Sequence, residues 1–157
     1  MMVMQEVIDF IEKLNNDHEG IRGYVNIMLA ELKDLQYDNR NLNWTTGVEV
    51  ARLNQKYLNI KQTAGYLEEG LSRHWEIEEN QLPALIGKPL MEALQIEHHD
   101  ILKQLKEVNE ILINSSLQEF SEKLIHLDSL VTHLCNLISD HEMKESTILQ
   151  LLRKRFE

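Results

Sequence analysis

Hydrophobic residues recur at steps of three and four along four stretches of the chain, the spacing that places them on one face of an α-helix. Charged and polar residues fill the positions between them, so each helix would have a single apolar face to bury. The four apolar stripes run from Val3 to Leu32, from Leu53 to Leu85, from Met91 to Leu112 and from Phe120 to Leu152. The spacing therefore predicts four amphipathic helices that share one core.

Three short breaks separate the stripes, at residues 38–47, 83–89 and 114–116. The first ends in Thr46-Gly-Val-Glu49, and in the third Ser116 is followed by Glu119; both pairs have the form of a helix capping box. The second contains Gly87 and Pro89, and proline is suited to a first helical turn. Connections this short favour an all-α, up-down-up-down four-helix bundle.

Composition agrees with one globular helical domain over residues 1–157, because 43% of residues are hydrophobic, 27% are charged, and only six are glycine and two proline. A net charge of −10 argues against a nucleic-acid partner, since such proteins neutralise phosphates with clustered lysine and arginine. We find no apolar run long enough to cross a membrane and no secretory signal, so we expect a cytoplasmic protein without a membrane partner. The one cysteine, Cys135, excludes a disulfide framework within the chain and is expected in the core.

Six polar residues interrupt the apolar stripes and carry the candidate chemistry. They are His18, His74, Glu78, His98, His141 and Glu145. Each helix supplies one histidine, and the second and fourth helices add a glutamate four residues later, on the same helix face. A carboxylate on a core face is costly unless it is paired or binds a metal, and imidazole with carboxylate suits iron, manganese or zinc. Two histidines per ion and two bridging glutamates would give each of two cations four protein ligands, with a solvent-derived bridge and an open position completing the shell.

Three of the four histidines are predicted to lie at one level of the bundle. His74 and His98 each lie nine residues from the prolines that bound the second break, about 13 Å along their helices. His18 and His74 are each 28 residues from Thr46 in the first break.

The fourth histidine fits this level less well. His98 lies 16 residues before Asn114, whereas His141 lies 25 residues after Ser116. His133 matches the level better, but it is off the apolar stripe and has no carboxylate four residues later. The pattern favours His141, which then requires an irregular third connection or an overhanging fourth helix, and His133 remains the alternative ligand.

The remaining polar candidates have more ordinary expectations. His99 is expected to be exposed or beside the site, and His126 and His133 to be packing or surface residues. Glu79 and Glu142 are expected to face solvent or to orient an imidazole of the site. A single core histidine is more often hydrogen-bonded packing than a ligand, so it is the combination of six residues that predicts a metal site.

These residues resemble the hemerythrin-like HHE domain family. Asp17-His18-x-x-Ile21 and Glu97-His98-x-x-Ile101 are similar to the family's paired DH and EH motifs. His74-Trp-Glu-Ile-Glu78-Glu79-Asn-Gln-Leu82-Pro83 resembles its HxxxEE motif, and His141-Glu-Met-Lys-Glu145-Ser146 resembles a second version in which serine replaces the second acid. The repeated order of the motifs indicates two related helical hairpins.

The resemblance covers about residues 7–152 and implies a non-haem di-iron centre with an oxo or hydroxo bridge. It implies that the four histidines named above are terminal ligands and that the two glutamates bridge. Oxygen-carrying hemerythrins use a second histidine on the third helix and an aspartate on the fourth, where this chain has Leu102 and Glu145. The chain is similar to the four-histidine branch, which is linked to oxygen, nitric oxide or peroxide reactivity and to iron sensing or repair.

Three functional hypotheses follow. The first is a di-iron protein that binds or senses a small ligand (oxygen, nitric oxide or peroxide) or handles iron. The second is a di-iron enzyme acting on peroxide or nitric oxide. The third is a metal-free signalling or interaction bundle, with His99 as a phosphoacceptor. The chain has no Glu-x-x-His pair, so ferritin-like di-iron enzymes are set aside.

Overall fold

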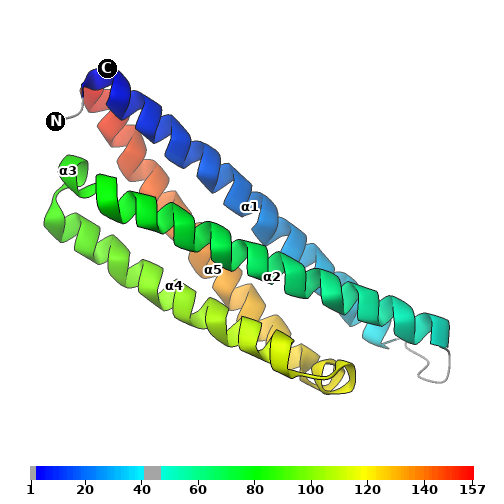
Figure 1. Cartoon of the computed structure of the whole chain (residues 1–157). Helices are drawn as coiled ribbons and strands as arrows, with labels where there is room; N and C mark the ends of the chain where they lie inside the picture. The colour runs from blue at the N-terminus through cyan, green and yellow to red at the C-terminus, as the bar shows by residue number, and fades with distance from the viewer. Residues whose placement is uncertain (1–2, 41–46) are drawn as a thin grey trace.

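Four long helices form the bundle that the apolar stripes predict. The computed structural model describes residues 3–40 and 47–157. The long helices are α1 (Met4–Arg40), α2 (Gly47–Gln81), α4 (Lys88–Asn114) and α5 (Leu117–Phe156), and the short α3 (Pro83–Ile86) lies between the second and third of them. Successive long helices run in opposite directions, and the two chain ends lie at the same end of the bundle (Figure 1). The prediction of an all-α bundle is confirmed.

The helices pack as a square, with α1 and α4 each lying against both α2 and α5. The buried apolar side chains fall into two clusters. One, at the end with the chain termini and α3, includes Val7, Phe10, Leu14, Met91, Leu94 and Leu149. The other, which extends to the opposite end, includes Ile21, Leu71, Ile101, Phe120 and Ile138. None of the helices in the described ranges is both long enough and apolar enough to span a bilayer.

The helix ends differ from the sequence prediction at the first two breaks. Residues 38–40 continue α1, and the expected cap at Thr46 lies outside the described residues. The second stripe was extended too far, because α2 ends at Gln81 and Leu85 belongs to α3. Pro83, which has no backbone N–H to continue the helix, occupies the first turn of α3. Gly87, at a φ of 86°, lets the chain turn from α3 into α4.

Two positions on the stripes were also assigned wrongly. Val3 precedes α1 and is exposed. On α5, the steps of three and four from Glu145 to Leu152 pass through Ile148, but Ile148 packs only partly against the core and its neighbour Leu149 is fully buried. Both stripes nevertheless bury the face that the periodicity indicated.

The connection between α4 and α5 explains how His98 and His141 reach one level although they lie at different distances along their helices from it. His98 lies 16 residues before Asn114 and His141 lies 24 residues after Leu117, a difference of about 12 Å along the two helices. Ser115 and the helix-capping Ser116 have extended backbones, which can carry the chain about 10 Å from Asn114 to Leu117. The irregular connection and the overhanging helix expected with His141 are therefore both present.

Hydrogen bonds hold this connection in place. The hydroxyl of Ser116 accepts a hydrogen bond from the backbone N–H of Glu119 at 3.2 Å, which confirms the predicted cap. From α2, the buried Tyr57 hydroxyl lies within donating distance of the carbonyl oxygens of Leu112 and, at 2.8 Å, Ser115. The Tyr57 ring also packs on Phe120 of α5, with ring centroids 4.3 Å apart.

Tyr57→Phe should lower the free energy of unfolding by about 1–3 kcal/mol, because it leaves buried carbonyl groups without their donor. Urea denaturation followed by circular dichroism measures this loss. Tyr66→Phe on the exposed side of the same helix is the matched control and should change stability by less than about 0.5 kcal/mol. Equal stability of the two variants would contradict this role of Tyr57.

Candidate metal centre

The six polar residues of the apolar stripes lie together in the middle of the bundle, between the two apolar clusters. On α1, α4 and α5 they fall between a residue of one cluster and a residue of the other, as His18 falls between Leu14 and Ile21. On α2 they lie between Leu71 and Leu82, the residue that directly follows the helix. None of the six side chains exposes more than 2% of its surface. The helical spacing thus turns all six inward at one level, His141 included.

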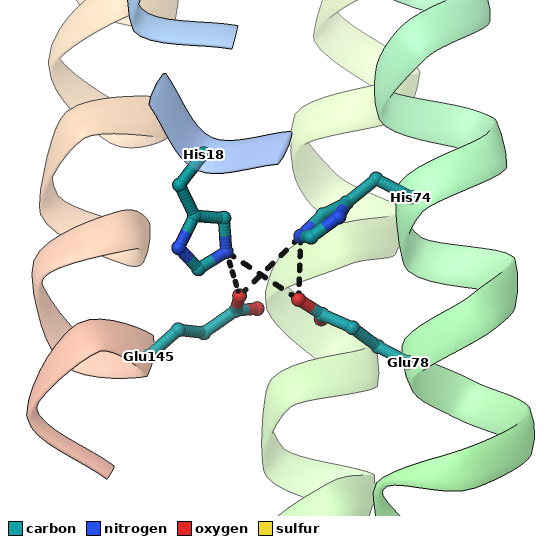
Figure 2. A group of neighbouring side chains, drawn as sticks. All are labelled: His18, His74, Glu78 and Glu145. Atoms are coloured by element: carbon teal, nitrogen blue, oxygen red, sulfur yellow. Dashed lines mark hydrogen bonds and ion pairs between the residues drawn. The ribbon is translucent and has the colours of Figure 1, made fainter. Parts of the chain in front are cut away.

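One half of the cluster is formed by the histidines of α1 and α2 (Figure 2). Nε2 of His18 lies 2.8 Å from Oε2 of Glu145 and 3.5 Å from Oε1 of Glu78. Nε2 of His74 lies 2.6 Å from the same Glu78 oxygen and 3.9 Å from the same Glu145 oxygen. One oxygen of each glutamate therefore faces this pair of histidines.

The histidines of α4 and α5 form the other half. Nε2 of His98 lies 3.0 Å from Oε1 of Glu145 and 3.4 Å from Oε2 of Glu78. Nε2 of His141 contacts the same Glu145 oxygen. Each glutamate thus turns its second oxygen toward this second pair, so both carboxylates lie between the two halves.

The arrangement of these atoms fits a pair of cations. Among the described residues, Nε2 of His74, Nε2 of His141 and both Glu78 oxygens are buried without a hydrogen-bond partner, although they lie close to one another. Atoms with lone pairs that converge in this way without hydrogen bonding offer a ready set of metal ligands. Two groups could each hold an ion. They are His18 with His74, Glu78 and Glu145, and His98 with His141 and Glu145.

The charges of the cluster depend strongly on one another. Burial acts to lower the pKa of His18 and of His74, but the carboxylates of Glu145 and Glu78 outweigh it and raise these pKa values to about 9 and about 10. Burial acts to raise the pKa of Glu145, but the surrounding histidines hold it well below its ordinary value. The imidazoles and carboxylates therefore favour each other's charged forms, and a bound cation would compete with the imidazole protons.

Three of the four histidines are held at their other ring nitrogen by an acid from a neighbouring helix. Oδ2 of Asp17 lies 3.1 Å from Nδ1 of His74, and Oε1 of Glu79 lies 3.1 Å from Nδ1 of His98. Oε1 of Glu97 lies 3.4 Å from Nδ1 of His141. An Nδ1–H bonded to a carboxylate leaves Nε2 free to face the centre. Asp17 and Glu97 received no role from the sequence, although the acid directly before a histidine in both DH and EH motifs was the signal.

Trp75 covers one side of the cluster and was also missed. Its ring stacks on His98 with centroids 4.3 Å apart and an interplanar angle of 8°, and it meets His141 edge-on at 5.5 Å. Trp75 directly follows His74 on α2, which places it one position from the ligand face. It keeps water from the His98 side.

The other polar candidates lie where the sequence predicts. His99, His126 and His133 are exposed. Cys135 is a core residue, and burial raises the pKa of its thiol to about 11. Of the two expected positions of Glu142, the one facing solvent does not hold, because only 6% of its surface is exposed. Burial raises the pKa of Glu142 to about 7, against the opposing effect of His18 and Arg22.

The chain also matches a known protein family. The family model described as the hemerythrin HHE cation binding domain matches residues 9–152. No curated protein and no solved structure matches the chain significantly.

We expect Fe²⁺ or Co²⁺ to quench the fluorescence of Trp75 when added to metal-free protein, because its ring stacks directly on His98. A Trp44→Phe background leaves Trp75 as the only tryptophan. Zn²⁺, which has no unpaired electrons, is the control and should bind with much less quenching. Undiminished fluorescence in the presence of saturating Fe²⁺ would show that no metal binds beside this ring.

Proposed function

Since the chain belongs to the hemerythrin HHE cation-binding domain family, we propose that its buried histidines and glutamates bind two iron ions. His18 and His74 would hold one ion, and His98 and His141 the other. Glu78 and Glu145 would bridge them.

The position of the two carboxylates is the observation that carries this proposal. Oε2 of Glu145 faces His18, whereas Oε1 faces His98 and His141. Glu78 divides in the same way, with Oε1 toward His74 and Oε2 toward His98. A carboxylate that serves two histidine pairs with its two oxygens is suited to bridging two ions.

The protein supplies few ligands to each ion, which leaves room for an external molecule. Two imidazoles and one oxygen from each bridging carboxylate make four protein ligands per ion. Leu102, one turn after His98, packs against the apolar core and adds no ligand. Iron with an open position can bind and activate a small molecule.

We therefore propose that the protein binds or senses oxygen, nitric oxide or peroxide at this centre, or handles iron. A di-iron enzyme acting on peroxide or nitric oxide would use the same residues and is the second candidate. A metal-free bundle with His99 as phosphoacceptor is weaker, because it assigns no role to two buried carboxylates surrounded by four histidines.

His98→Ala and His99→Ala test the metal site with adjacent residues of the same type. His98 is buried against the carboxylates and His99 is exposed, so only the first change should reduce the iron content below two ions per chain. Elemental analysis and near-ultraviolet absorption of aerobically purified protein measure this. Wild-type protein that holds no iron, and whose melting temperature does not change on chelation, would rule out the proposal.

Binding and catalysis can be separated on the iron-loaded protein. We expect nitric oxide or peroxide to change the absorption spectrum with a fixed stoichiometry, because the centre has open positions. Glu76→Ala, an exposed change on α2 between His74 and Glu78, should leave this change intact, whereas Glu145→Ala should abolish it. Sustained turnover of either molecule would favour the enzyme, and an unchanged spectrum with both would contradict ligand binding.

A further inference from the structure

His18 differs from the other three histidines at its outer ring nitrogen. Its Nδ1 is buried and has no hydrogen-bond partner among the described residues. Figure 2 shows this nitrogen turned away from the carboxylates, toward α5. The other three histidines each have an acid at this position.

Glu142, on α5, lacks a hydrogen-bond donor, just as Nδ1 of His18 lacks an acceptor. Both of its carboxylate oxygens are buried without a hydrogen-bond partner among the described residues. Its only ion-pair partner there is Arg22, whose Nε lies 3.7 Å from Oε2 and whose side chain is largely exposed. The charges of His18 and Arg22, one turn apart on α1, both act on this carboxylate. A buried donor and a buried acceptor therefore lie without partners on the same α1–α5 interface.

The repeated hairpins explain how this arises. Trp75 directly follows His74 and Glu142 directly follows His141, so the two occupy equivalent positions. Glu79 directly follows Glu78, and Ser146 follows Glu145 in the same way. In one hairpin the tryptophan stacks on His98 and the glutamate bonds its Nδ1. In the other hairpin, Ser146 occupies the position of Glu79, and its side chain is too short to reach across to α1. The acid of this hairpin, Glu142, occupies the position of Trp75 instead.

A surface pocket lies next to Glu142. A pocket of about 440 Å³ lies on the surface between α1 and α5, and Arg22, Glu142 and Ser146 are among its lining residues. A single water can bridge a buried donor and acceptor that do not touch.

We propose that Glu142 is the positioning residue of His18, accepting its Nδ1–H directly or through one water and so directing Nε2 to the metal. Glu142 would complete a set in which each of the four ligand histidines is held by one acid. The proposal rests on the proposed metal-binding function of the cluster.

Glu142→Leu tests it by metal titration. The variant should bind one of its two Co²⁺ ions with an affinity about 10- to 100-fold lower than wild type, the usual effect of removing a group that orients a ligand. The other ion should bind with an affinity near that of wild type. Visible absorption and calorimetry of Co²⁺ binding to the full chain give both constants. The metal-free variant should melt at an unchanged or higher temperature, because it no longer buries a carboxylate without hydrogen bonds. A merely structural residue would not weaken one ion selectively.

Matched variants separate positioning from simple loss of charge or packing. Ser146→Glu in the Glu142→Leu background places an acid at the position equivalent to Glu79 and should restore the weakened affinity. Glu142→Gln keeps an oxygen acceptor and should lose less affinity than the leucine variant. Asp140→Leu, an exposed acid on the other side of His141, should leave both constants unchanged. If Glu142→Leu does not fold, Glu142→Ala permits the same comparison.

The outcomes distinguish the role of Glu142 from the metal-binding function on which it rests. Wild-type protein that binds no Co²⁺ would overturn the metal site itself. Two wild-type affinities in Glu142→Leu, or no restoration by Ser146→Glu, would leave the metal site standing and overturn the role of Glu142.

Discussion

Two carboxylates in the middle of an apolar core set the main physical constraint on this protein. Glu78 and Glu145 are almost completely buried, where an isolated charge is strongly disfavoured. Four imidazoles surround them, as protonated partners or as fellow metal ligands. The inward faces of all four long helices must therefore meet at one level.

The apolar core around this level is what holds the six polar side chains in position. It is divided into two clusters by the six polar residues, and every long helix contributes to both, α2 through the partly buried Ile77 at the end with the chain termini. Packing on either side therefore fixes how each helix is rotated and how far it is shifted along its axis. The acids at Nδ1 add a second restraint, because each comes from a helix other than that of the histidine it holds.

The two hairpins repeat the same histidines and glutamate, but the residues around them differ. On one side Trp75 covers His98 and Glu79 holds its ring. On the other, Glu142 borders a surface pocket, and its carboxylate and Nδ1 of His18 are both buried without a hydrogen-bond partner among the described residues. The two halves of the centre thus have different access to water and different outer hydrogen bonds, which are among the properties that tune a metal ion.

The sequence by itself determined the four helices, the inward face of each and the six residues that interrupt those faces. These features follow from local periodicity, because residues three or four apart share a helix face wherever the helix packs. The tertiary structure decided which acid holds which histidine, that Trp75 covers His98 and that Glu142 is buried. It also placed His141 rather than His133 in the buried cluster, because the extended residues let α5 begin beyond the end of α4. These outcomes depend on the rotation and axial shift of one helix against another, which the spacing within a helix does not contain.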